Sequence, residues 1–224
     1  MVVTQRGTPG TSEGVRELIR STAGKSSVKW AALFAYAAGA TGIFANSLLI
    51  AFFALQASHP DDGFSLGSAN DTVGSLATAF MIPVALSLGG RLPQRRSARF
   101  TQAAGLTAMA LLSVGGPLLV LGVLAFEVAT PIAMAGWIIL SLWLLLVNRW
   151  LRLSAALRPR LARLGEFLGA GTLAGYVVVG LGLLLPWMSW VQLVVFGVGG
   201  LIGLPAWLGI PVWFVLLGRH LAAS

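Results

Sequence analysis

The run from Trp30 to Gln56, WAALFAYAAGATGIFANSLLIAFFALQ, contains no charged residue. A helix rises about 1.5 Å per residue and the hydrocarbon layer of a bilayer is about 30 Å thick, so about 20 apolar residues cross it. This run is longer than that. Only 10% of the 224 residues are charged, whereas soluble domains carry about 25%. Both observations predict a membrane protein.

Five further apolar runs follow the first one, separated by hydrophilic segments. They predict an all-α polytopic membrane protein with six transmembrane helices. The expected spans lie at about residues 30–56, 72–90, 102–126, 131–148, 167–185 and 191–218. A tail of residues 1–29 precedes the spans and a short C-terminus, residues 219–224, follows them. Tail and first run are too long for an ordinary cleaved signal peptide, so we expect the first span to be retained.

The basic residues sort to one side of this arrangement. Alternating the segments places all 15 Lys and Arg on one face, in the tail, in residues 91–100, in residues 149–166 and at the C-terminus. The opposite face has acidic residues and a histidine but no Lys or Arg. Because basic residues beside spans stay in the cytoplasm, both termini are predicted to be cytoplasmic. Thirteen of the 15 basic residues are arginine, as in GC-rich bacteria, so we expect a multi-pass protein of the bacterial inner (plasma) membrane.

Three local features are expected beside the spans. Ser12 begins a pattern that favours a short helix on the membrane surface, and a disordered tail is the alternative. Asn70 or Asp71 is expected to cap the first turn of the second span. In residues 149–166, leucines recur at helical spacing among arginines, which predicts a helix at the headgroup level that Pro159 kinks.

Polar residues and helix breakers inside or beside the spans are the candidate transport site. A primary amide in hydrocarbon needs a partner, Gly-Pro breaks expose backbone groups, and a carboxylate at a pore mouth can accept a proton or a cation. In the last run the prolines and glycines predict a kinked or locally unwound helix. The candidate patch consists of Asn46, Ser47, Pro117, Glu127, Gly200 and Pro205.

Each of these features also has a purely structural interpretation. The amide of Asn46 suits an interhelical hydrogen bond, and the glycines suit close packing of the fifth and sixth spans. Glu127 suits an ordinary turn. A polar cavity wall is the functional alternative, and it would join Asn46 to Thr78, Ser113 and Tyr176.

The arginines of the basic face are sufficiently explained as determinants of topology. In addition, a cytoplasmic basic patch is suited to anionic lipid headgroups, whereas a nucleic-acid partner is not expected. The candidate lipid contacts are Arg95, Arg96, Arg99, Arg152, Arg160 and Arg163.

Several kinds of cofactor chemistry lack their ligands. The chain has no cysteine, which excludes disulfides, thiolate zinc sites and iron–sulfur clusters. There is no HExxH sequence, and the two histidines fall on opposite faces. His59, Asp61 and Asp62 are a possible metal cluster, although a turn is the simpler interpretation of an acidic pair after a proline. We therefore expect no metal, no cofactor and no enzymatic activity.

Two segments carry a resemblance to known proteins. The segments WLGIPVWFVLLGR, from Trp207 to Arg219, and ANDTVGSLATAFMIPVAL, from Ala69 to Leu86, resemble those of small uncharacterised multi-span membrane proteins of GC-rich bacteria. The resemblance implies the same six-span architecture and supplies no catalytic residues.

Two functions remain open on the sequence. The first is a binding, regulatory or assembly role in the membrane, with the lipid bilayer and its headgroups as partners; small-residue faces are also compatible with a homo-oligomer. The second is a small transporter or channel that uses kinked spans 2, 3 and 6 around Asn46. A carrier predicts a water-accessible cavity at Asn46, whereas a scaffold predicts that this amide is paired and closed off.

Overall fold

The computed structural model describes the backbone of residues 11–56, 63–186 and 189–223, and the side chains of residues 28–55, 66–186 and 189–223. This part of the chain folds into helices and turns without a strand. The helices are α1 (Thr11–Gln56), α2 (Gly63–Gly89), α3 (Arg96–Val120), α4 (Phe126–Leu153), α5 (Pro159–Gly182) and α6 (Trp190–Ala222). All six are long and apolar enough to cross a membrane, which confirms the predicted all-α class and six helices of spanning length in the described residues.

Two helices extend beyond the predicted span boundaries. α1 is continuous from Thr11, so Ser12 lies inside it and does not begin a separate surface helix. α2 begins at Gly63, so Asn70 and Asp71 lie within the helix and do not cap it. This extension is supported by packing on α1, because a Cβ atom at Gly67 would lie 3.4 Å from the ring of Phe52. Residues 1–10 lie outside the described residues.

The predicted headgroup helix of residues 149–166 is wrong. α4 continues to Leu153, the chain turns, and α5 begins at Pro159. Ala155 makes this turn in the left-handed region with φ of 54°. Pro159 starts a helix and does not kink one, because the first turn of a helix leaves its N–H groups unpaired and proline has none to lose.

The last run was predicted to be kinked or locally unwound, and the local unwinding is wrong. α6 remains helical through Pro205 and Pro211, and α3 remains helical through Pro117. Pro211 lies in a close contact with α1, since a Cβ atom at Gly42 would approach the Pro211 ring to 2.8 Å. The glycines of α1 therefore accommodate the proline ring, and packing against a neighbour supports the helix where one backbone bond is lost.

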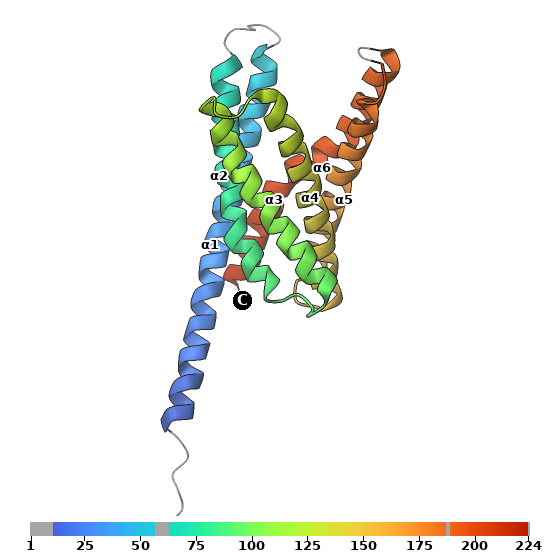
Figure 1. Cartoon of the computed structure of the whole chain (residues 1–224). Coiled ribbons are helices and arrows are strands. Elements are labelled where there is room, and N and C mark those ends of the chain that lie inside the picture. Colours follow the sequence, from blue (N-terminus) through green and yellow to red (C-terminus); the bar gives the residue numbers. More distant parts are fainter. Residues whose placement is uncertain (1–10, 57–62, 187–188, 224) are drawn as a thin grey trace, which may run out of the picture.

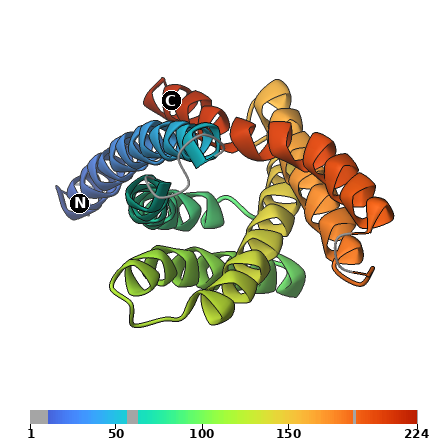
Figure 2. The same ribbon diagram turned by 90° about the horizontal axis from the view of Figure 1, so that it is seen from above.

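The six helices form a closed ring. Each helix packs against its two neighbours in the chain, and α6 packs against α1 to complete the circle. Seen from above, α5 and the start of α6 lie on the side opposite α1 and α2, the C-terminal end of α6 lies beside α1, and α3 and α4 complete the circle (Figure 2). The ring therefore has an interior to which every helix can contribute residues.

Figure 1 shows the turns at the two ends of the ring, and the residues at these two ends differ in charge. The arginine-rich end contains the α2–α3 turn, the α4–α5 turn and the last turn of α6, and it carries ten arginines: Arg91, Arg95, Arg96, Arg99, Arg149, Arg152, Arg158, Arg160, Arg163 and Arg219. The arginine-free end contains the start of α2, the α3–α4 link (121–125), the last turn of α5 and the first turn of α6. No Lys or Arg occurs in residues 57–90, 100–148 or 167–218.

The hydrophobic core lies toward the arginine-rich end. Val84, Trp143, Phe214 and Leu217 are almost fully buried there, and all six helices contribute to the cluster. Gln102 joins three helices in this half: its amide donates to the carbonyl of Ala85 at 2.7 Å and accepts from the Trp143 indole at 3.0 Å. The backbones of α4 and α5 also come close together in this half. A Cβ atom at Gly169 of α5 would lie only 2.6 Å from the Leu145 nitrogen of α4.

Candidate functional site

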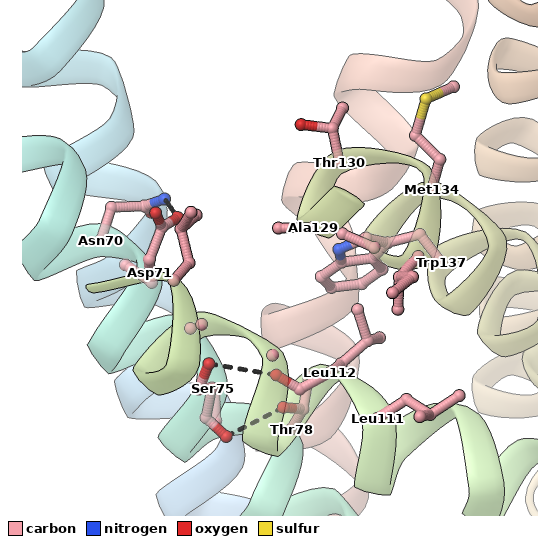
Figure 3. A pocket seen from close by; sticks show the side chains of 18 of the residues that line it. Asn70, Asp71, Ser75, Thr78, Leu111, Leu112, Ala129, Thr130, Met134 and Trp137 are labelled. Carbon is pink, nitrogen blue, oxygen red and sulfur yellow. Dashed lines mark hydrogen bonds between the residues drawn. The ribbon is translucent and has the colours of Figure 1, made fainter. Parts of the chain in front are cut away.

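A cavity of about 380 Å³ occupies the interior of the ring toward the arginine-free end. All six helices line it. It extends from Leu124 in the α3–α4 link to Met81 and Pro211, near the middle of their helices. Figure 3 shows Asn70 and Asp71 of α2 on one side of the cavity and Thr130 and Met134 of α4 on the other. The packed core closes the cavity on the arginine-rich side.

One face of α2 forms a wall of the cavity. The lining residues Asp71, Gly74, Ser75, Thr78 and Met81 recur at the three- and four-residue spacing of a helix face. A Cβ atom at Gly74 would meet nothing within 4 Å. The part of the α2 wall nearest the arginine-free end is therefore polar, and open space lies beside Gly74.

The hydroxyl groups of this wall are used to hold α2 against α3. Ser75 donates to the carbonyl of Leu112 at 3.1 Å, and the hydroxyls of Thr78 and Ser113 lie 3.3 Å apart. The helices come close here because α3 has Gly116, where a Cβ atom would lie 2.5 Å from the carbonyl oxygen of Asp71. Ser75 and Thr78 are thus structural groups, even though they line the cavity.

Asn46 and the Asn70–Asp71 pair have different hydrogen bonding. Asn46 of α1 is 9% exposed and lines the cavity, and its amide makes no hydrogen bond with another described residue. The Asn70 amide donates to the Asp71 carboxylate at 3.3 Å. Among the described residues that line the cavity, Asp71 is the only Asp, Glu, Lys or Arg. These groups are available to a ligand.

Aromatic side chains line the lower part of the cavity. Trp137 of α4 and Trp207 of α6 meet edge to face, with ring centroids 5.7 Å apart and planes at 72°. Tyr176 of α5 lines the same region. The indole N–H of Trp207 is buried without a hydrogen-bond partner. Trp137 and Trp207 join α4 to α6 at the level where the cavity gives way to the core.

The predicted patch does not assemble as one site. Asn46 lines the cavity, but Ser47 is exposed on another face of α1 and donates to the Ile43 carbonyl at 3.0 Å. Pro117, Glu127, Gly200 and Pro205 are not among the residues that line the cavity, and Glu127 and Pro205 are exposed. Gly200 has no neighbour within 4 Å of a Cβ position. Of the predicted helix breakers, Pro117, Gly200 and Pro205 therefore do not face the cavity, whereas Gly115 and Gly116 of α3 and Pro211 of α6 line it.

The alternative polar wall is closer to the arrangement found. Asn46, Thr78 and Tyr176 line the cavity, and Ser113 stands behind Thr78. Sequence reasoning did not select Trp137 and Trp207, because tryptophans in apolar runs look like lipid-facing or core residues. Their spacing to other lining residues is the signal that was present: Ala129, Ala133 and Trp137 share one face of α4.

The candidate lipid-binding arginines lie at the arginine-rich end. Arg95, Arg96, Arg99, Arg160 and Arg163 are exposed. The Arg99 guanidinium donates to the side-chain amide oxygen of Gln94 at 2.7 Å. Arg152 differs from them, because its guanidinium donates to both carboxylate oxygens of Glu166, at 2.5 and 3.1 Å. That bidentate pair joins α4 to α5.

Residues Gly63–Gly67, GFSLG, match the G-x-S-x-G pattern of a hydrolase nucleophile elbow. Such an elbow places the serine on a sharp turn between a strand and a helix. Here the five residues open α2, and the described chain has no strand. The match therefore gives no support for a hydrolase site. His59, Asp61 and Asp62 lie outside the described residues.

Comparison of the chain with protein-family models, with curated proteins and with solved structures yields no match. The candidate site therefore depends on the geometry of this structure.

Proposed function

We propose that this chain is a six-span protein of the bacterial inner membrane that binds a small molecule in the cavity of its arginine-free half. The observation that carries the proposal is the convergence of all six helices on one cavity of about 380 Å³. Small-molecule sites are mostly concave and apolar, have about 300 to 1,000 Å³, and contain a few placed polar groups. Asn46, Asn70 and Asp71 are such groups in an otherwise largely apolar lining.

The charge distribution supports one orientation of the ring. Basic residues beside spans are retained in the cytoplasm, so the arginine-rich end and both termini are cytoplasmic in our proposal. The cavity then faces the periplasmic half of the bilayer, where Asn70 and Asp71 lie near its entrance. The ligand therefore reaches the site from the outside or from the outer leaflet.

Filling the cavity tests the binding role. Gly74→Phe places a ring in the open space beside the α2 wall, and Gly197→Phe is a matched control on α6, because neither glycine has a neighbour within 4 Å of its Cβ position and Gly197 is exposed outside the cavity. Native mass spectrometry of protein released gently from its membranes reports the bound molecule. We expect a discrete mass on the wild type and on Gly197→Phe that Gly74→Phe loses. Equal occupancy in all three proteins contradicts the proposal.

A transport role is the second candidate, and the closed ring favours it. A cavity at one end and a packed core at the other are what a carrier has in one of its two states. Transport requires the core around Trp143 and Phe214 to open toward the arginine-rich end. Once mass spectrometry has defined the ligand, uptake into proteoliposomes separates the two roles. A carrier should accumulate the ligand inside proteoliposomes that have an ion gradient, compared with the same proteoliposomes without one. A binding protein should only retain the ligand, with or without the gradient.

The arginine-rich end supports a contact with anionic lipid headgroups. Arg95, Arg96 and Arg99 are exposed in one turn of the chain at this end. Such charges near a surface contribute about 1 kcal/mol each to attraction toward anionic lipid. We expect the triple replacement of these arginines by glutamine to reduce the phosphatidylglycerol retained in native mass spectra, and Arg219→Gln to have a smaller effect. Retention that does not change with either variant contradicts this contact.

A further inference from the structure

The cavity combines a carboxylate with an aromatic floor. Asp71 lies in its upper part, on α2, and Trp137 and Trp207 lie lower, on α4 and α6. Figure 3 shows Asp71 on one side and the Trp137 ring on the opposite side of the open space. A ligand that fills this space contacts a negative charge at one side and aromatic rings at the other.

Among the described residues, none that lines the cavity is a Lys or Arg that could neutralise Asp71. The described arginines lie at the opposite end of the ring. The closest polar partner is the Asn70 amide, a neutral donor at 3.3 Å. A half-buried carboxylate without a counter-ion is costly in a low-dielectric site, and a cationic ligand removes that cost.

Other ligand classes fit the site less well. An anion meets Asp71 with no compensating cation. A hard divalent ion needs about six oxygen ligands, whereas Ser75 and Thr78 are engaged in helix contacts and Asp71 is a single carboxylate. A wholly apolar ligand leaves the carboxylate unpaired. An organic cation with an apolar body satisfies both parts of the cavity.

We infer that the cavity binds an amphipathic organic cation, with its ammonium group at Asp71 and its apolar body against Trp137 and Trp207. This inference depends on the proposed binding function and specifies its ligand class. The aromatic rings contribute by packing against the apolar body of the ligand, where ring contacts add about 0.5 to 1.5 kcal/mol beyond the area they bury. The same arrangement suits entry from the lipid, since Phe126 and Leu124 give the upper rim an apolar surface.

Equilibrium dialysis of radiolabelled benzyltrimethylammonium against the full-length protein in nanodiscs tests the inference. Empty nanodiscs measure the background. Asp71→Asn removes the charge and keeps the shape, and Glu127→Gln is its control, because Glu127 is an exposed carboxylate near the same end that does not line the cavity. We expect Asp71→Asn to weaken binding about tenfold or more, the usual cost of removing one partner from a desolvated charge pair. Glu127→Gln should bind as the wild type does.

The aromatic contact and the charge are tested separately. Trp137→Leu removes the ring that packs against the benzyl group of the probe and should weaken binding by about three- to tenfold. Neopentylbenzene, which has the shape of the probe without its charge, should compete poorly.

The outcomes separate the ligand class from the binding role. Equal competition by neopentylbenzene, or Asp71→Asn with unchanged affinity, overturns the cationic ligand. So does the absence of saturable binding of the probe. In each of these cases loss of a native ligand mass from Gly74→Phe would still support the proposed function, whereas unchanged occupancy in that variant contradicts the binding role itself.

Discussion

The two halves of this ring are built from the same six helices but are filled differently. Toward the arginine-rich end, large side chains such as Trp143, Phe214 and Leu217 are almost completely buried. Toward the arginine-free end, the buried hydrophobic residues are small, among them Ala45, Ala77 and Ala129, and the interior is a cavity. On α4 and α6, for example, small buried residues lie toward the arginine-free end and large ones in the core, so residue size distinguishes the two halves.

The hairpin of α5 and α6 shows the same division. Near the arginine-rich end, α5 touches α4 closely at Gly165 and Gly169, and α6 touches α1 at Gly218. At the other end the hairpin extends away from α2, α3 and α4 (Figure 1). Leu184 and Leu201 in this part are 81% and 80% exposed. Gly175 and Gly203 still join α5 to α6. The hairpin is thus fixed to the ring at one end only, which leaves the cavity open.

The first prediction concerns the two ends themselves and has an all-or-none result. The chain has no cysteine, so a single cysteine reports its own position. Val123→Cys lies in the α3–α4 link, where Val123 is 70% exposed, and Ser97→Cys lies exposed at the arginine-rich end. A membrane-impermeant maleimide should label Val123→Cys in intact cells, with the outer membrane permeabilised, and Ser97→Cys only after lysis. The reverse pattern contradicts the orientation and places the cavity on the cytoplasmic side.

The second prediction uses glycine to distinguish a packed half from a hollow one. Gly169→Leu forces a side chain into the α4 backbone at Leu145, whereas Gly74→Leu places the same side chain in open space. We expect Gly169→Leu to lower the free energy of unfolding by about 3 kcal/mol, and Gly74→Leu to change it by less than about 1 kcal/mol. Reversible unfolding in mixed micelles measures both. Similar losses in the two variants would mean that the cavity is as tightly filled as the core.

The third prediction compares two tryptophans on α4. Trp143→Phe removes the donor to Gln102 in the core, and Trp137→Phe keeps an aromatic ring at the cavity. A buried acceptor without its donor costs about 1 to 3 kcal/mol, so the first variant should be destabilised by about that amount. The second should lose less stability, and its effect should fall on ligand occupancy. The same unfolding assay, read beside native mass spectra, distinguishes them. Equal stability losses would show that Trp137 also serves the core.

The architecture was predictable because length and apolar composition determine it. Six charge-free runs predicted six helices, and the structure confirms that number. Helix ends were less predictable, since apolarity does not mark where helical hydrogen bonding stops. α2 extends past Asp71 by packing on α1, and Pro159 begins α5 because proline suits a first turn. Charge and hydropathy carry no information about such contacts.

The site was only partly predictable. Asn46 was selected because an amide in hydrocarbon is conspicuous, and it lines the cavity. Pro117, Gly200 and Pro205 were selected as helix breakers, but a proline in a well-packed helix leaves the helix intact. Which face of each helix points inward depends on how all six pack together. That arrangement follows from the close contacts of glycines such as Gly116 and Gly169, whose partners lie on other helices.

The smallest expected effect on stability belongs to Asn46→Leu, and it decides whether this amide belongs to the core or to the cavity. If Asn46 held helices together, its loss would cost about 0.6 to 2 kcal/mol, the range of interhelical hydrogen bonds in membranes. In the structure it has no hydrogen-bond partner among the described residues, so we expect a change within about 0.5 kcal/mol together with reduced ligand occupancy. Ser47→Leu, on the exposed face of the same turn, controls for added apolar surface and should change neither. A clear loss of stability with unchanged occupancy would assign Asn46 to the packed half, and the boundary between core and cavity would then lie one turn nearer the arginine-free end.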